Sequence, residues 1–553
     1  MQRSSEQASS SGRARHWRVS VPFVIGALTL AACGSSTPKA TPSTSASSGA
    51  VSSSAAGSTT AGSAASGSTT AGSTTASTGA TVTTTGTPTG GSGKTVVVGA
   101  ALEPSSLDII HKAGAAIDQV LLDNVYETLL KTDKNQKIIP GIATQSVSAD
   151  AKTVTLKLQS GVKFSDGHDL TSADVVWSLQ AFAAKDGTGA GLLSSISAVT
   201  APDASTVQIA LTAPDNDLLF NLTQREGAVI EANAANLDKS AVGTGPFTLR
   251  EWNTGTSITL VANPTYWGKK PSIGGVTFRY ITDPNAQINA IKTGDLNILT
   301  NASAELVEPL KSDSNFVVTD GKSNGEFTLG FNNSKPALSD VRVRKAIREA
   351  IDKKGLLQLL GGYGTLIGAP VPPTDPWYED LTASAPYNPT DAKALLAAAG
   401  HASDLNLSFV YPNLYPANIA EYVVSQLKAV GITVTVTTVD FTTWLTQVYT
   451  NHDYDLTAVD HAEPHDLGNY ANPKYYWLYD SPAVQKLIAD AKTEADPAKS
   501  IDDLKKAAEQ ISQDSPADWL FLFPDISVAQ KNITGYPVDN IDARFDASGI
   551  AVG

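Results

Sequence analysis

A tract of small polar residues decides which part of this chain can fold. Residues 34–93 are almost entirely serine, threonine, alanine and glycine, with a loosely repeated Ala-Gly-Ser-Thr-Thr unit. Too few apolar side chains are present to form a core, so we predict a flexible tether with a root-mean-square reach of roughly 40–45 Å, or a glycosylated stalk of the same composition. All globular structure must then form from the about 460 residues that follow.

The segment before the tether has the organisation of an export signal. Four arginines and one glutamate in the first 18 residues precede the apolar run Val19–Leu30, which is too short to span a bilayer. The only cysteine, Cys33, ends a Leu-Ala-Ala-Cys sequence that resembles the lipobox of bacterial lipoproteins. We therefore expect lipidation of Cys33, and attachment through this lipid alone to the outer face of the cell membrane, facing the cell wall or periplasm. A free cysteine beside an ordinary cleavage site is the alternative.

The charge balance argues against a nucleic-acid partner. The chain carries 40 basic and 54 acidic residues, a net charge of −14. Outside the first 18 residues the counts are 36 and 53, a balance of −17. An acidic surface of this kind keeps a protein soluble and repels nucleic acid.

The sequence motifs favour neither a cofactor nor catalysis. Gly91–Thr95 resembles the end of a phosphate-binding P-loop, but Pro88 occupies the position of its first glycine, and Val96–Val98 predict a strand where a helix is needed. No His-Glu-x-x-His metalloprotease motif is present. We expect no cofactor, no catalytic residue and no enzyme, and a tethered extracellular hydrolase is the least favoured interpretation.

Hydrophobic periodicity predicts a mixed α/β protein. Apolar and polar residues alternate as in a strand at Thr153–Leu158, and Thr171–Phe182 combines a capping threonine with helical spacing of its apolar residues. Further elements are expected as helices at Val341–Leu360, Asn388–Ala399, Ile419–Val430 and Thr442–Tyr449 and as a strand at Ile432–Val439. The folded region is too long for one ordinary core, so we expect two or three lobes in which helices cover sheets.

A series of short motifs identifies the family that the folded region resembles. In chain order the motifs are Asn124–Leu130, Ile139–Ala143, Gly161–Gly167, Leu170–Val175, Gly243–Phe247, Asn263–Trp267, Ile291–Asp295, Phe331–Asn332 and Asp340–Ile347. Together they closely resemble the family 5 extracellular solute-binding proteins, the receptors of peptide and nickel ABC importers, over almost all of residues 95–530. Each motif also fits a turn or core segment, so the motifs identify the family without locating its binding site.

The resemblance implies a two-lobed α/β fold of the periplasmic-binding-protein type 2 kind, with an extra domain inserted in the first lobe. The expected segments are a signal at 1–32, the tether at 33–93, the main domain of the first lobe at 95–130, 242–320 and 525–553, the inserted domain at 131–241, and the second lobe at 321–524. The chain is expected to cross between the lobes near Gly321–Glu326 and Phe523–Asp525.

The same resemblance implies a receptor that closes its two lobes over an extracellular solute. An oligopeptide is the solute that we expect, delivered by a monomeric receptor to the permease subunits of an ABC importer. Two alternatives stay open: a receptor for a nickel or other metal complex or a small cationic solute, and a sensor or chaperone that acts without a transporter.

In peptide-binding members, an acid of the second lobe pairs with the ammonium terminus of the peptide, shortly after a strand that resembles Tyr454–Val459. The next residues here are Asp460-His461-Ala462-Glu463-Pro464-His465-Asp466. In this segment the family's aromatic is a histidine and its acid is replaced by the proline. The residues that we expect to line the pocket are Glu463, as the partner of the ammonium group, with Asp460, His461, His465 and Asp466.

His461 and His465 raise the alternative of a transition-metal site, since imidazole and carboxylate groups bind such ions. Two histidines four residues apart share a face only on a helix, and Pro464 lies between them. We therefore expect no metal site. A solvated loop without ligand contacts is the remaining alternative for this segment.

Further ligand contacts are expected on both sides of the cleft. The resemblance places three residues at the edge of the first lobe that hydrogen-bonds the ligand through its backbone: Ala113, Gly114 and Ala115. Three aromatic residues are candidate walls of the pocket: Trp444, Trp377 and Tyr378. Packing in the core is the alternative for each aromatic residue.

Overall fold

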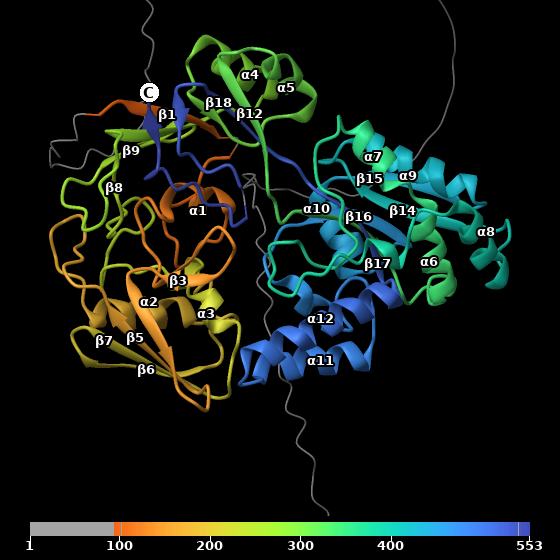
Figure 1. The fold of residues 1–553 in the computed structure, drawn as a ribbon, viewed down its shortest axis with the longest axis horizontal. Coiled ribbons are helices and arrows are strands. Elements are labelled where there is room, and N and C mark those ends of the chain that lie inside the picture. The colour runs from red at the N-terminus through yellow and green to blue at the C-terminus, as the bar shows by residue number, and fades with distance from the viewer. Residues whose placement is uncertain (1–92, 101, 540) are drawn as a thin grey trace, which may run out of the picture. The chain divides into compact units, whose positions relative to one another are not determined.

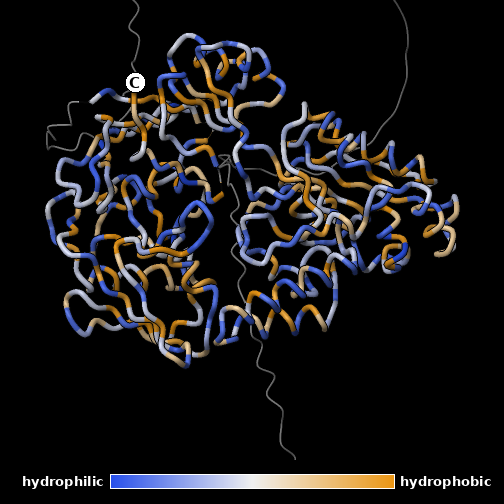
Figure 2. Tube along the Cα trace, in the orientation of Figure 1, coloured by the Kyte–Doolittle hydropathy of each residue, from blue (hydrophilic) through white to orange (hydrophobic). Residues whose placement is uncertain are grey.

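The computed structural model describes residues 93–100, 102–539 and 541–553 (Figure 1). The predicted signal at 1–32, the lipidation site Cys33 and the tether up to residue 92 lie outside the described residues. Three larger sheets, of seven, five and four strands, organise the described part of the chain. Figure 2 shows hydrophobic residues concentrated along their strands. No helix in this part is long and apolar enough to cross a membrane.

The seven-stranded sheet joins segments from distant parts of the sequence. Its order is β12-β18-β11-β1-β10-β9-β8, with β1 parallel to β10 and β11 and the other pairs antiparallel. The strands are β1 (Thr95–Ala100), β8 (Phe247–Asn253), β9 (Ser257–Ala262), β10 (Gly275–Tyr280), β11 (Ile298–Leu299), β12 (Phe316–Gly321) and β18 (Asp525–Gln530). Three helices lie between these strands in the sequence: α1 (Ala115–Leu121), α4 (Pro284–Thr293) and α5 (Ala304–Lys311).

The five-stranded sheet has the order β15-β14-β16-β13-β17, in which β14 is parallel to β15 and β16, and β13 is antiparallel to β16 and β17. Its strands are β13 (Glu326–Phe331), β14 (Asn406–Pro412), β15 (Thr433–Val439), β16 (Leu456–His461) and β17 (Ala517–Leu522). Every residue of β13 and β17 is buried, because separate apolar clusters cover the two faces of the sheet.

Helices and short helical turns supply those clusters. The helices are α6 (Val341–Ala350), α7 (Lys353–Leu359), α8 (Pro389–Ala398), α9 (Ala417–Ala429), α10 (Phe441–Trp444), α11 (Pro482–Thr493) and α12 (Pro497–Asp514), and the turns are η2 (Thr382–Ser384), the π-helical η3 (Leu445–Thr450) and η4 (Asp466–Ala471). Since η4 follows β16 closely, it begins within the segment that the sequence predicts to bind the ligand.

The four-stranded sheet is antiparallel throughout, in the order β4-β5-β7-β6. Its strands are β4 (Ala143–Val147), β5 (Thr153–Leu158), β6 (Ile196–Asp203) and β7 (Thr206–Leu211), and α2 (Ser172–Ala183) packs on them. Smaller elements are β2 (Leu130–Thr132), β3 (Ile138–Pro140), α3 (Leu218–Asn221), η1 (Arg225–Gly227), β19 (Ile533–Thr534) and β20 (Ala551–Val552).

The chain passes between the seven-stranded and five-stranded sheets at two places. The first is Lys322–Gly325, between β12 and β13, and the second is Phe523–Pro524, between β17 and β18. The two crossings lie side by side, because the Phe523 N–H donates to the Gly325 carbonyl at 2.7 Å. They lie within the two segments where crossovers between lobes are predicted, and the lobe boundaries stay a prediction. Glu326 follows the first crossing directly.

Most predicted elements are confirmed, and one helix prediction is wrong. Thr153–Leu158 is β5, and α2 begins after Thr171, whose N–H donates to the Asp174 carboxylate at 2.9 Å. Val341–Leu360 is not one helix, since it divides into α6 and α7. The break occurs at Asp352, whose carboxylate accepts the Gly355 N–H at 3.1 Å and caps a new helix.

Candidate ligand site

The site is built at the point where β13 begins and β16 ends. In the antiparallel pair, Glu326 lies opposite His461, and Phe327 lies opposite Asp460. Opposed residues of a ladder share a face of the sheet, and neighbours along a strand point to opposite faces. Glu326 and His461 therefore lie on one face and Asp460 on the other, and His461 is the last residue of the strand.

Three carboxylates gather near His461 in what we call the acid cluster: Glu326, Asp375 and Asp466. Glu326 is 3% exposed, Asp375 is 5% exposed, and the Asp466 side chain is 6% exposed. Burial, followed by the charges of neighbouring acids, raises the pKa of Glu326 and Asp375 well above the usual range and that of Asp466 to about 8. These carboxyl groups therefore resist ionisation in the absence of a cation.

Aromatic rings surround the acid cluster. The rings of Tyr470 and Trp477 stack with centroids 4.3 Å apart, and the Tyr476 hydroxyl lies 2.9 Å from His461 Nε2. The His461 and Tyr476 rings are also nearly parallel, with 8° between their planes and 5.9 Å between their centroids. Such rings present negatively polarised faces that attract cations.

His465 connects the acid cluster to α3, which belongs to a distant part of the chain. Its ring stacks on the Phe220 ring with 3.6 Å between the centroids. It also packs edge-to-face with the Trp377 ring, with 4.5 Å between the centroids. His465 Nε2 lies 3.9 Å from Asp375 Oδ1, and the residue has the left-handed backbone angle φ 58°. Burial lowers the pKa of His465 to about 3 and that of His461 to about 4, so both rings are neutral at pH 7.

The other predicted acids lie beside the cluster. Glu463 is exposed, and its charge raises the pKa of Asp460 and Asp466. The Asp460 N–H donates to the Tyr415 hydroxyl at 3.0 Å, and burial is the larger cause that raises the pKa of this acid to about 7. The structure thus groups the predicted acids, and which of them binds ligand stays a prediction.

The predicted aromatic residues divide between two surroundings. Trp377 touches His465, and its indole N–H has no hydrogen-bond partner among the described residues. Trp444 lies deeper, where its indole N–H donates to Thr457 Oγ1 at 2.8 Å and its ring meets the edge of Tyr476. Tyr378 is partly buried against the apolar cluster that contains Trp377 and Trp444.

The predicted backbone edge at Ala113–Ala115 is held by a residue that the sequence analysis missed. Arg225 donates to the Gly114 carbonyl at 3.1 Å and to Asp118 at 2.7 Å, and it also bonds the carbonyl groups of Ile109 and Lys112. Among the described residues, no hydrogen bond joins Ala113–Ala115 to the acid cluster. Arg225 therefore fixes the position of this edge, and the edge is not hydrogen-bonded to the acid cluster among the described residues.

Two members of the acid cluster, Glu326 and Asp375, were not predicted from the sequence. Glu326 is the one acid in the otherwise apolar and neutral strand β13, directly after a crossing, and Asp375 lies two residues before Trp377. A lone acid at the start of a fully buried strand is the signal that could have identified Glu326.

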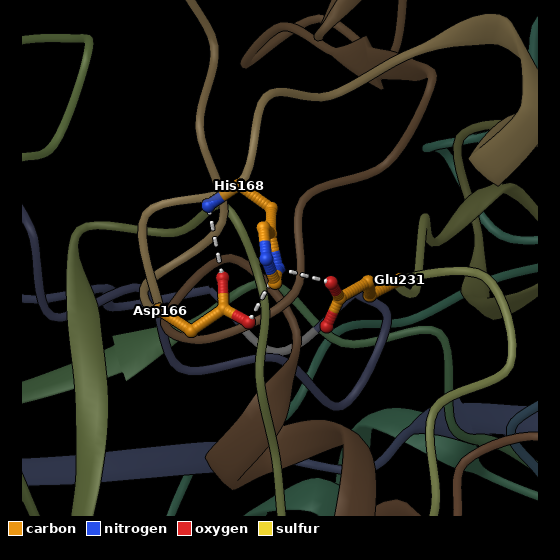
Figure 3. A group of neighbouring side chains, drawn as sticks. All are labelled: Asp166, His168 and Glu231. Atoms are coloured by element: carbon orange, nitrogen blue, oxygen red, sulfur yellow. Dashed lines mark hydrogen bonds and ion pairs between the residues drawn. The ribbon is translucent and has the colours of Figure 1, made fainter.

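A different group has the spacing of metal ligands. Within the part of the chain that the structure describes, only Asp166, His168 and Glu231 place three ligand atoms within reach of one ion (Figure 3). His168 Nδ1 lies 2.9 Å from Asp166 and 2.6 Å from Glu231. Hydrogen bonding to Glu231 and the charges of both acids raise the pKa of this exposed histidine, as in a surface ion pair.

A cavity of about 200 Å³ lies away from the acid cluster, next to Asp123, Lys131 and Arg544. Its two cations are already paired: Lys131 lies 2.9 Å from Asp123, and Arg544 lies 3.3 Å from Asp123 and 3.1 Å from Asp542. The remaining lining acids, Asp539 and Asp546, form no ion pair among the described residues, so the cavity is acidic overall.

A Gly-x-Ser-x-Gly sequence occupies Gly321–Gly325. In hydrolases this motif forms a sharp turn from a strand into a helix. Here it is the crossing from β12 to β13, and Ser323 Oγ accepts the Gly325 N–H at 2.9 Å. Among the described residues no histidine bonds Ser323, so the motif lacks the setting of a nucleophile.

Comparisons with known proteins agree with this architecture. The sequence model of the bacterial extracellular solute-binding proteins, family 5, matches residues 137–483. The oligopeptide-binding protein AppA of Bacillus subtilis is 26% identical over 501 residues, which cover 80% of this chain and 89% of AppA. The probable D,D-dipeptide-binding periplasmic protein DdpA of Escherichia coli is 27% identical over 459 residues, which cover 77% and 88% of the two chains.

Solved structures show the same fold. AppA in complex with a nonapeptide has a TM-score of 0.67 and 23% identity over 83% of this chain and 100% of AppA. The periplasmic binding protein DppA of Helicobacter pylori, in complex with the peptide STSA, has a TM-score of 0.69 and 22% identity over 83% and 98% of the two chains. The α/β fold with two lobes is thereby confirmed.

Proposed function

This chain belongs to the bacterial extracellular solute-binding proteins of family 5, and we propose that it captures oligopeptides outside the cell for an ABC importer. The observation that carries the proposal is the group of acids at the end of β16, which has no lysine or arginine partner among the described residues. Such a group suits the ammonium terminus of a peptide. The relatives named for peptide binding support the same solute class.

A peptide would be held through its terminus and its backbone. Glu463 is exposed and close to Asp460 and Asp466, so it can receive an ammonium group with little rearrangement. The edge at Ala113–Ala115, fixed by Arg225, is proposed to hydrogen-bond the peptide backbone from the other lobe, as an added strand does. Backbone recognition makes such a site tolerant of different side chains.

Release and capture require the lobes to move about the crossings. We assign the first lobe to 95–130, 242–320 and 525–553, its inserted domain to 131–241, and the second lobe to 321–524. Only Lys322–Gly325 and Phe523–Pro524 then connect the lobes covalently, so a few backbone angles can absorb the motion. A ligand that contacts both lobes shifts the population toward the closed state.

The proposal includes the cellular setting. Lipidation of Cys33 would hold a monomeric receptor at the outer face of the membrane, within reach of its permease subunits, on the tether of residues 33–93. A receptor for a metal complex has less support, since His461 and His465 do not belong to the one group of the described residues that has metal-ligand spacing.

Native mass spectrometry of the full chain, purified in detergent without refolding, tests the function. We expect a mixture of short peptides to be released on denaturation, because a site that reads the backbone and terminus retains many sequences. A single defined metal chelate or non-peptide solute in stoichiometric amount would contradict the proposal. Uptake of the released peptides by a strain that lacks the chain separates a transport receptor from a sensor.

A further inference from the structure

Once a bound cation favours their ionised forms, the acids of the candidate site can neutralise more than one ammonium group. Five carboxylates lie in and beside the acid cluster: Glu326, Asp375, Asp460, Glu463 and Asp466. No lysine or arginine of the described residues forms an ion pair with any of them, and the nearby histidines His461 and His465 are neutral at pH 7. The terminus of a peptide supplies a single positive charge.

Within the acid cluster, two buried carboxylate oxygens have no hydrogen-bond partner among the described residues. Glu326 Oε1 and Asp375 Oδ2 make no hydrogen bond among the described residues, although both side chains are more than nine-tenths buried. A buried acceptor without a donor destabilises a fold. The two oxygens lie in the site that contacts α3 through His465. Their missing hydrogen-bond donors therefore indicate a ligand.

Other buried acids of this chain show what a structural carboxylate looks like. Glu127 is 1% exposed and accepts hydrogen bonds from Thr244 at 2.9 Å, Tyr266 at 2.8 Å and Trp267 at 2.7 Å. Asp518 is fully buried and leaves Oδ2 without a hydrogen bond, but its charge is paired, since Oδ1 lies 2.6 Å from Lys353 Nζ and 3.2 Å from Arg348 Nε. Glu326 and Asp375 have no comparable partners, so a purely structural role does not account for them.

The surroundings of the acid cluster suit a flat cation. Tyr470 and Trp477 form a stacked pair, and Trp377 contacts His465 beside Asp375. A guanidinium group binds carboxylates with two parallel hydrogen bonds and stacks on aromatic faces, whereas a lysine ammonium is a compact, strongly hydrated charge. Carboxylates among aromatic rings therefore favour arginine over lysine.

We propose that the receptor prefers peptides whose first residue is arginine, with the side-chain guanidinium bound by Glu326, Asp375 and Asp466. The inference rests on the proposed function and deepens it. The first residue is the one concerned, because its side chain leaves the same carbon atom as the ammonium group, and the acids beside Glu463 are the ones within its reach. One ligand end thus delivers two positive charges to neighbouring carboxylates.

Isothermal titration calorimetry of the full chain with three tripeptides tests the preference. The peptides are Arg-Ala-Ala, citrulline-Ala-Ala and Ala-Ala-Ala, in which citrulline is the uncharged counterpart of arginine. We expect Arg-Ala-Ala to bind roughly tenfold or more tightly than citrulline-Ala-Ala, the effect of a charged hydrogen bond. Equal affinities of these two peptides would overturn the inference and leave the peptide receptor intact.

Three variants test which carboxylate causes the preference for arginine over citrulline. Glu326→Gln should bring the affinity ratio of the arginine and citrulline peptides close to one, whereas Glu463→Gln should weaken both by the same factor. Glu305→Gln removes an exposed acid of α5 and should change neither. An unchanged ratio in Glu326→Gln would contradict the assignment.

The failures of the two proposals are distinguishable. If Glu326→Gln does not fold, as judged by circular dichroism, Asp375→Asn provides the same comparison, and the wild-type ratio alone can already refute the preference. Binding of none of the three peptides, together with one bound non-peptide solute in native mass spectrometry, would refute the peptide receptor and the arginine preference with it.

Discussion

Burial changes the proton affinity of acids and histidines in opposite directions, and the candidate site contains both. It raises the pKa of Asp466 to about 8 and that of Asp460 to about 7, and it lowers the pKa of His461 to about 4 and that of His465 to about 3. Near pH 7 the unliganded site therefore holds neutral imidazoles and partly protonated acids. A bound cation would favour the ionised carboxylates, so binding should release protons.

The stability of the unliganded protein should fall as the pH rises from 6.5 to 8. An acid with a raised pKa stabilises the fold below its unfolded value, and this stability is lost as the pH passes through the folded pKa. The shift of Asp466 alone implies a loss of about 1–2 kcal/mol in this window. Urea unfolding of ligand-free protein at both pH values measures it.

The histidines do not interfere in that window. Their lowered folded pKa values add stability above pH 6.5, where they are neutral in both states, and this stability is lost only at more acidic pH. The other titratable groups that face Asp466 are Glu326, Asp375, Glu463, Tyr470, Tyr475 and Tyr476. Asp466→Asn should flatten the dependence of the unfolding free energy on pH. An unchanged slope in this variant would show that another group causes this dependence.

At the same scale, the sequence located one half of the candidate site. Asp460–Asp466 could be predicted because the segment follows a strand with clear alternation and a family resemblance. Asp375 could not, since it approaches through a loop distant in sequence. A lone acid in an apolar strand marked Glu326 as unusual, but its approach to His461 depends on the pairing of β13 with β16. Local periodicity contains no information about which distant carboxylates meet.

At the scale of elements, capping decides where helices begin more firmly than apolar spacing does. The apolar positions of Val341–Leu360 continue across Ile351, which is 1% exposed, so periodicity predicts one helix. The chain instead starts α7 at Lys353, where Asp352 caps the first turn. An aspartate competes for backbone N–H groups in this way because its side chain is short.

Replacement of this cap has a defined cost. Asp352→Ala removes the hydrogen bond to the Gly355 N–H, so we expect the free energy of unfolding to fall by about 1 kcal/mol. Urea denaturation measures the change. Glu421→Ala, on the exposed face of α9, is the control and should shift the free energy by less than about 0.5 kcal/mol. Equal effects of the two variants would show that Asp352 does not act as a cap.

The whole molecule must balance closure against release. Asn216 bonds the end of α11 and the residue that follows this helix. Its N–H donates to the Lys492 carbonyl at 3.2 Å, and its side-chain amide donates to the carbonyl groups of Ala491 and Glu494, both at 2.8 Å. Together with the stacking of Phe220 on His465, these bonds join the proposed inserted domain to the second lobe. The lobe boundaries themselves stay a prediction.

Asn216→Ala should therefore weaken ligand binding without touching the ligand. The variant loses two hydrogen bonds that exist only when the lobes meet, each contributing about 1 kcal/mol. Closure becomes less favourable by about 2 kcal/mol, so the affinity for peptide should fall by up to roughly thirtyfold. Calorimetry measures the affinity, and stopped-flow dissociation should show faster release. Gln208→Ala, an exposed substitution on β7, controls for surface changes. If Asn216→Ala binds as the wild type does, these bonds persist in the open state, and the hinge must move other parts of the chain.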